Sequence, residues 1–179
     1  MTPWIKAGIV TGSILFAGAP LVAQDADEAS SNRVAAKTDW SVFVEDNPTE
    51  CWGVSSPKET VNTRDGKPVS VTRGDILLFV TFRPGAGAAG EVSFTGGYPF
   101  AGGSTVTVEV GTNKFELFTE GEWAWPASAD DDAKLVTALK RGAEATLIAR
   151  STRGTQTADT FSLMGFTAAM EEAEKRCAR

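Results

Sequence analysis

The chain has 179 residues, 42% of them hydrophobic and 22% charged, and its formal net charge is −6 at pH 7. This length predicts one domain with a substantial core, and the negative charge without a basic run disfavours binding to nucleic acids or anionic membranes. The sequence contains no histidine, which excludes Ser-His-Asp and Cys-His catalysis and every metal site built on histidine.

The first 23 residues predict a secretory signal peptide. Lys6 is followed by the mainly apolar residues 9–16, and the small residue Ala23 precedes the first acidic side chains. This pattern is typical of a segment that is cleaved after export, here after Ala23. The apolar run is short for a bilayer span, so we expect no stable membrane span after cleavage. The mature protein is expected in the periplasm or outside the cell.

Residues 24–39 predict a flexible polar leader, because small and polar residues dominate its first part and no periodic apolar face is present. We therefore expect the single folded domain to span residues 40–179.

The folded domain is predicted to be mainly β. Short runs with alternating apolar and polar residues or with β-branched and aromatic residues recur along the chain, separated by glycine-rich turns. These runs span residues 40–45, 75–82, 91–94, 104–110, 114–119, 145–151 and 159–164. Such spacing favours an antiparallel β-sandwich.

Two segments depart from this pattern and predict helices. Residues 130–141 begin with three acids, end with two basic residues and are followed by Gly142, as expected of a short internal helix. The C-terminal segment predicts a second helix whose apolar residues share one face that should lie across the sandwich. That face comprises Phe166, Met170, Ala173 and Cys177.

Several short motifs lack the context that their chemistry requires. Residues 85–90 spell G-x-G-x-x-G, but the β-like residues 91–94 follow where a nucleotide site needs a helix, so we predict a hairpin connection. Residues 55–58 match S-x-x-K without its partner motifs, and residues 73–75 read Arg-Gly-Asp; both are interpreted as turns. The acids at 130–132 lack the spacing of a calcium loop. No cofactor or metal is predicted.

Trp123 and Trp125 are candidate binding residues because they fall on one face of a strand. Exposed, they would form a platform for sugar rings or for a protein partner. Buried, they would belong to the core, which is the favoured interpretation because tryptophan is mostly buried.

Charged side chains provide weaker candidates. Arg150 and Arg153 flank a predicted turn and could hold an anion, although a solvated hairpin end is the commoner outcome. An enzyme using carboxylates such as Asp75, Glu91 or Glu116 would need a cleft that the sequence cannot show.

Several segments together resemble the invasion-associated locus B proteins, a family of small exported bacterial proteins. The resemblance spans residues 40–177 and rests on Cys51-Trp52 with "SSP" behind it, "RGDILLFVTFRPG", "EVSFTGGYPF", "LVTALKRG", "TFSLMGFTAAM" and Cys177. It implies a periplasmic or secreted β-sandwich, associated in some pathogens with entry into host cells. No reaction comes with the resemblance, so it singles out structural positions and no active site.

Cys51 and Cys177 are the only two cysteines and are predicted to form a disulfide. An even number of cysteines in an exported protein favours pairing. The bond would attach the last helix to the sheet.

These observations lead to a functional prediction. We expect an exported, non-enzymatic envelope protein that binds an unidentified envelope or host protein. The alternative is a carbohydrate-binding or envelope-glycan-binding module that uses Trp123 and Trp125.

Overall fold

The computed structural model describes residues 32–47 and 49–178. The predicted signal peptide and residues 24–31 of the predicted leader lie outside these ranges. The strands are β1 (Arg33–Lys37), β2 (Trp40–Asp46), β3 (Thr49–Ser55), β4 (Glu59–Arg64), β5 (Lys67–Pro68), β6 (Leu77–Arg83), β7 (Ala88–Thr95), β8 (Thr105–Val110), β9 (Asn113–Glu120), β10 (Trp123–Trp125), β11 (Glu144–Arg150) and β12 (Gln156–Ser162). The helices are α1 (Ala129–Arg141), α2 (Phe166–Cys177) and the 3-10 turn η1 (Pro84–Ala86).

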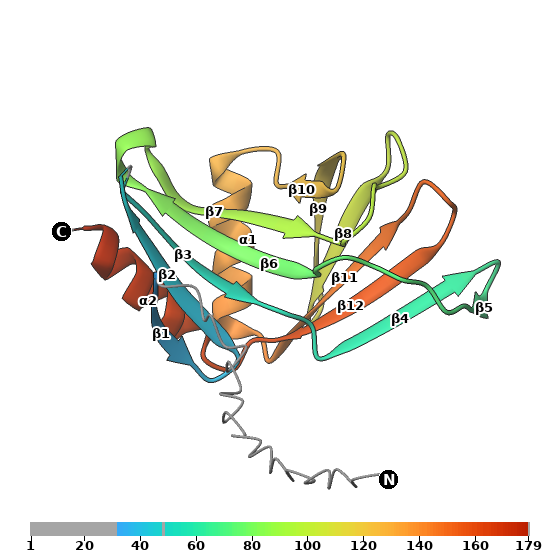
Figure 1. Ribbon diagram of the computed structural model, residues 1–179, viewed down its shortest axis with the longest axis horizontal. Coiled ribbons are helices and arrows are strands. Elements are labelled where there is room, and N and C mark those ends of the chain that lie inside the picture. Colours follow the sequence, from blue (N-terminus) through green and yellow to red (C-terminus); the bar gives the residue numbers. More distant parts are fainter. Residues whose placement is uncertain (1–31, 48, 179) are drawn as a thin grey trace, which may run out of the picture.

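All twelve strands of the described residues belong to one antiparallel sheet, in the order β1-β2-β3-β6-β7-β10-β9-β8-β11-β12-β4-β5. Figure 1 shows that this sheet is strongly curved. Phe94 of β7 contacts Phe161 of β12 edge-on, with 6.2 Å between the ring centroids, although β10, β9, β8 and β11 lie between these strands in the sheet. The two limbs of the sheet therefore face each other across a common core. The predicted mainly β, antiparallel fold with an internal and a C-terminal helix is confirmed.

The concave face of the sheet carries the core. Inward side chains alternate along each strand with outward ones, as the sequence pattern predicts. Trp40 is one of the largest buried side chains; its ring meets Phe166 of α2 edge-on at 4.9 Å, and its Nε1–H donates to the carbonyl of Ser162 at 3.0 Å. The core thus joins β2, β12 and α2 directly.

Helix α1 has the boundaries that its sequence signals predict. Ser128 is the N-cap, and its hydroxyl accepts a hydrogen bond from the Asp131 amide. Leu135 and Leu139 are fully buried, and α1 packs against β7. Its three acids therefore lie in the first turn, where they interact favourably with the helix dipole.

Helix α2 buries the face that the sequence predicts and packs against β1, β2 and β3. A Cβ at Gly53 of β3 would meet Met170 Cε of α2, so the Met170 side chain would have to shift. Gly165 at the start of α2 has φ +88° and lies against the Lys37 carbonyl, where a side chain would collide. No helix in the described part of the chain is long and apolar enough to cross a membrane.

The predicted leader is corrected for its last residues. Arg33–Lys37 forms β1, which pairs with β2, so the folded domain begins before Trp40. The segment lacks large alternating apolar side chains, and Val34 is 38% exposed. Backbone pairing with β2 and packing against α2 hold this segment in place. Neither interaction can be recognised from the local sequence.

The glycine motif at residues 85–90 connects two strands, as predicted. η1 and Gly87, with φ +71°, join β6 to β7 in an antiparallel hairpin, and β7 continues where a nucleotide-binding helix would have to start.

Candidate functional site

The two tryptophans of β10 point away from the core. Ala124 is fully buried and lies opposite Phe94, so its neighbours Trp123 and Trp125 must point to the outer face of the sheet. Trp123 is 40% exposed, and Trp125 is half-buried. The interpretation of both residues as core was wrong, because alternation predicts that they share a face but not that this face is inside.

Each tryptophan contacts a phenylalanine on a neighbouring part of the outer face. Trp123 lies beside Phe79 of β6, with 5.8 Å between ring centroids. Trp125 lies beside Phe118 of β9, at 5.4 Å, and Phe118 is 47% exposed. These contacts place aromatic rings from three strands on one surface.

A third aromatic pair extends the surface. Phe43 of β2 stacks on Trp52 of β3, with 5.6 Å between centroids and 8° between ring planes. The two residues are directly opposite in the strand register; Trp52 lies between the buried Cys51 and Gly53, and Phe43 follows the buried Val42. The outer aromatic face therefore comprises Phe43, Trp52, Phe79, Phe118, Trp123 and Trp125.

Charged side chains lie on the same face of the sheet. Arg83 of β6 forms an ion pair with Glu50 of β3 at 2.8 Å and another with Glu91 of β7. Partial burial opposes the charge of Arg83, but these two hydrogen-bonded carboxylates outweigh it and raise the pKa of the guanidinium. The group stays cationic, and its geometry is fixed by two partners.

A shallow groove of about 820 Å³ opens beside Trp125, where β7 and β9 separate beyond the short strand β10. Phe118 and Trp125 line it together with Glu91, Glu120 and Asp132 at the start of α1. Burial raises the pKa of Asp132, although the Val92 amide donates a hydrogen bond of 2.8 Å to its carboxylate. The groove thus offers aromatic rings and carboxylate acceptors to a ligand.

The other carboxylates named as enzyme candidates lie on separate segments. Asp75 is exposed before β6, and Glu116 on β9 accepts a hydrogen bond from the Thr107 hydroxyl at 2.9 Å. Glu91 is held by Arg83. Among the described residues, no hydrogen bond or ion pair joins any two of these three carboxylates, and no cluster of three or more acids or cysteines could hold a metal ion.

The two remaining short motifs have structural roles. Ser55 is buried at the end of β3, where its hydroxyl donates to the Asp39 carbonyl at 2.7 Å, and Lys58 pairs with the Asp39 carboxylate at 2.6 Å. Arg73 of the Arg-Gly-Asp sequence is buried in an ion pair with Asp159. The arginine side chain of this tripeptide is therefore not accessible to a receptor.

The two candidate arginines separate in the structure. Arg150 at the end of β11 and Arg153 in the β11–β12 turn are both exposed, but only Arg153 lines a second pocket. Arg64 lines the same pocket and was not singled out from the sequence. It lies 89 positions from Arg153, and only the pairing of β12 with β4 brings the two residues near each other.

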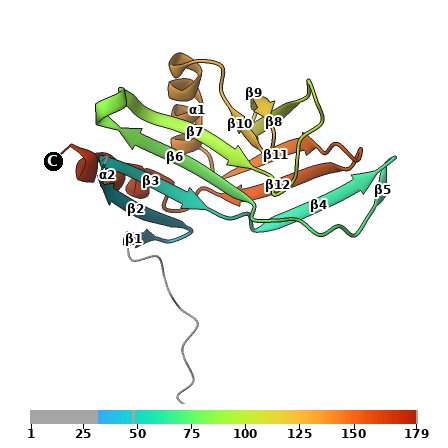
Figure 2. The ribbon, with the colours of Figure 1, turned by 45° about the horizontal axis from the view of Figure 1, so that its top comes forward.

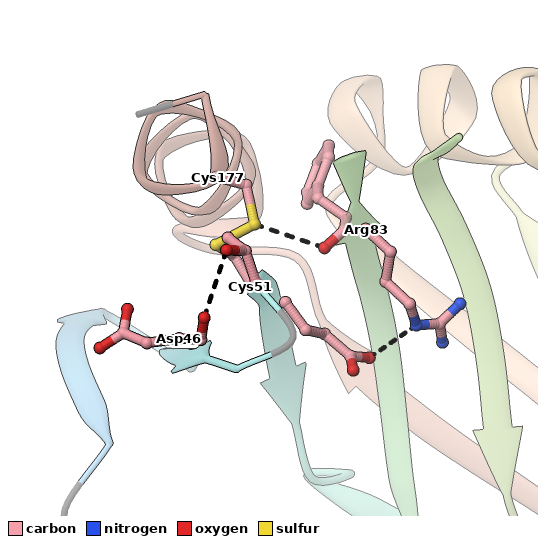
Figure 3. Close-up of a disulfide and its surroundings, with 7 residues drawn as sticks. Asp46, Cys51, Arg83 and Cys177 are labelled. Carbon is pink, nitrogen blue, oxygen red and sulfur yellow. Dashed lines mark hydrogen bonds and ion pairs between the residues drawn. A yellow bond between two sulfur atoms is a disulfide. The ribbon is translucent and has the colours of Figure 1, made fainter. Parts of the chain in front are cut away.

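Cys51 and Cys177 form the predicted disulfide, with an S–S distance of 2.12 Å and 5.7 Å between Cα atoms. Figure 3 shows the bond between the end of α2 and β3, beside Arg83. The Cys177 sulfur also lies 3.4 Å from the Phe82 carbonyl oxygen, which is a packing contact because a disulfide sulfur has no proton. The bond fastens α2 to the core face opposite the outer aromatic face.

Comparison with known proteins identifies the family. The family profile described as "Invasion associated locus B (IalB) protein" matches residues 72–174. The crystal structure of invasion associated protein B from Bartonella henselae has a similar fold, with a TM-score of 0.56 and 16% identity, over 81% of this chain and 98% of that chain. A search of curated proteins finds no significant match. Because the profile covers more than half of the sequence, this chain belongs to the invasion associated locus B family.

Proposed function

We propose that this protein is exported to the bacterial envelope and acts there, without catalysis, by binding a protein partner through the outer aromatic face. The observation that carries the proposal is the exposure of Trp123 and Phe118, at 40% and 47%, within a surface of three aromatic pairs. Extended aromatic surface is costly in water and is typical of interaction sites on soluble domains.

The composition of the face supports a protein as the ligand. Tryptophan and arginine are the residues that most often dominate binding energy at protein interfaces, and Arg83 stands on this face between two carboxylates. The rings belong to strands of a continuous sheet, so they are presented with little conformational freedom. Such preorganisation lowers the entropy cost of association.

Two features support export. The N-terminal sequence has the features of a signal peptide, and a disulfide is stable in the periplasm or outside the cell but rare in the cytosol. Membership of the invasion associated locus B family agrees with an envelope location.

The test is crosslinking in intact cells that express the full chain. The wild type is compared with the double variant Phe118→Ala/Trp123→Ala and with Met164→Ala, a matched control that removes a 63% exposed apolar side chain elsewhere. We expect one partner to be captured by the wild type and the control but lost with the double variant, whose melting temperature should stay close to that of the wild type. Capture of the same proteins by all three forms would contradict the proposal.

The groove beside Trp125 favours a second candidate function, which is glycan binding. Sugar rings stack on aromatic side chains, and their hydroxyl groups donate hydrogen bonds to carboxylates such as Glu120 and Asp132. Titration with soluble envelope polysaccharide should then quench tryptophan fluorescence. Trp125→Ala should abolish polysaccharide binding. Trp123→Ala should weaken binding if the aromatic platform extends to that residue. If polysaccharide gives no signal while the protein partner is captured, the glycan candidate is wrong.

A further inference from the structure

A second pocket, of about 560 Å³, is lined by residues from the end of β4 and from the β11–β12 turn. Figure 2 shows that these two elements lie at the same end of the sheet. The other walls of the pocket come from the loop before β6 and the segment after β7. This volume lies within the usual range of small-ligand sites, which is roughly 300 to 1,000 Å³.

Arg73, Tyr98 and Thr157, which line the pocket, belong to a polar network. Arg73 donates two hydrogen bonds, of 2.7 and 2.6 Å, to the buried carboxylate of Asp159. The Tyr98 ring lies 5.0 Å from the Arg73 guanidinium, and the Tyr98 hydroxyl contacts the Thr157 hydroxyl at 2.6 Å. The charge of Arg73 is therefore neutralised within the protein, and its network serves to shape the pocket.

Two further arginines line the pocket without a carboxylate partner. The Arg64 guanidinium donates a hydrogen bond of 2.7 Å to the hydroxyl of the buried Thr155, which leaves its other N–H groups available. Neither Arg64 nor Arg153 forms an ion pair with any of the described residues. Glu122 is the one carboxylate among the described residues that line the pocket.

This local excess of positive charge stands out in a chain whose net charge is −6. Ser70, Thr72 and Thr152 also line the pocket, and a hydroxyl group can donate a hydrogen bond. Guanidinium groups bind carboxylate and phosphate oxygens through paired, charge-assisted hydrogen bonds.

We propose that this pocket binds a small anionic ligand through its carboxylate or phosphate group, with Arg64 and Arg153 as the charged contacts. The site is separate from the outer aromatic face and does not depend on the function proposed for it. Its ligand chemistry is an oxyanion, which either a carboxylic acid or a phosphate compound can supply.

The experiment is an NMR chemical-shift titration of the full chain with inorganic phosphate in one arm and citrate in the other, at constant ionic strength set with chloride. We expect saturable shifts at Tyr98, Thr152 and Thr155 in at least one arm, and the arm with the lower Kd identifies the class of oxyanion. Arg64→Gln and Arg153→Gln should each raise that Kd at least about tenfold, as loss of a charge-assisted contact predicts.

Arg150→Gln is the matched control, because Arg150 is an exposed arginine close in sequence that does not line the pocket. It should leave the Kd unchanged, and all three variants should keep the wild-type melting temperature within a few degrees. The proposal is overturned if neither anion gives saturable shifts at the pocket, or if Arg150→Gln weakens binding as much as Arg64→Gln, which would indicate general charge attraction.

Discussion

The carboxylate of Asp159 is completely buried and receives two hydrogen bonds from the guanidinium of Arg73, whose side chain is 7% exposed. This ion pair fastens the loop before β6 to β12, and Arg73 also donates a hydrogen bond of 2.9 Å to the Gly96 carbonyl. Three separate segments therefore depend on one side chain.

The first prediction concerns this pair. Asp159→Ala leaves a buried guanidinium without its partner and is expected to lower the free energy of unfolding by about 3 to 5 kcal/mol. Urea denaturation provides the measurement. The double variant Arg73→Met/Asp159→Leu removes both charges and should be more stable than Asp159→Ala. If Asp159→Ala is as stable as the wild type, the pair has no structural role.

The second prediction concerns the disulfide. The Cys51–Cys177 bond joins positions 126 residues apart, for which chain-entropy theory gives on the order of 4 to 5 kcal/mol, with measured values often smaller. Cys51→Ser, Cys177→Ser and the double variant should lower the melting temperature by similar amounts, since each removes the same bond. Thiol titration of the denatured, unreduced protein should find no free sulfhydryl; two thiols per chain would rule out the pairing.

The third prediction separates the tryptophans by their burial. Trp40 is 1% exposed, so Trp40→Ala should cost about 3 to 5 kcal/mol, as usual for a large buried aromatic residue. Trp123→Ala should cost less than about 1.5 kcal/mol, because this side chain loses mainly its contact with Phe79. Chemical denaturation of both variants checks the difference, and equal losses would contradict the outward orientation of Trp123.

The fourth prediction concerns pH and the start of α1. The pKa of Asp131 is lowered from 3.8, chiefly by a hydrogen bond from the Ser128 hydroxyl and then by Lys134. Because the folded-state pKa lies below the unfolded-state value, this stabilisation is complete above about pH 3.8 and is lost as the pH falls through the lower folded-state pKa. Asp131→Asn should therefore be less stable than the wild type at pH 7, and the difference should shrink toward pH 2.

Helix content and denaturation curves at the two pH values test this behaviour. Asp130→Asn is the control, since it changes an exposed acid in the same turn that forms no ion pair with any of the described residues. A stability difference for Asp131→Asn that is the same at both pH values would exclude the proposed linkage.

The fifth prediction concerns export. The protein purified from its native envelope should begin at Gln24, because Ala23 supplies the small residue before the predicted cleavage position. Intact mass measurement of the purified protein tests this cleavage position. Recovery of a species that retains Met1 or Thr2 would show that no signal peptide had been removed.

The sequence by itself determined the local structure of this protein. The helix expected over residues 130–141 is observed at Ala129–Arg141, because Ser128, the acids of the first turn and Gly142 act within a few residues of one another. The helical face that ends at Cys177 and the hairpin formed by residues 85–90 were predictable for the same reason. The cysteine pair followed from the residue count and the predicted export.

The tertiary structure decided which faces and which distant residues meet. Trp123 and Trp125 flank Ala124, and the alternation is equally consistent with either face inside; the pairing of Ala124 with Phe94 turns both tryptophans outward. Arg73 and Asp159 are 86 residues apart, and only the tertiary structure brings them together. Strand order and curvature depend on long-range packing, to which many residues contribute weakly, so no short segment of the sequence encodes either candidate site.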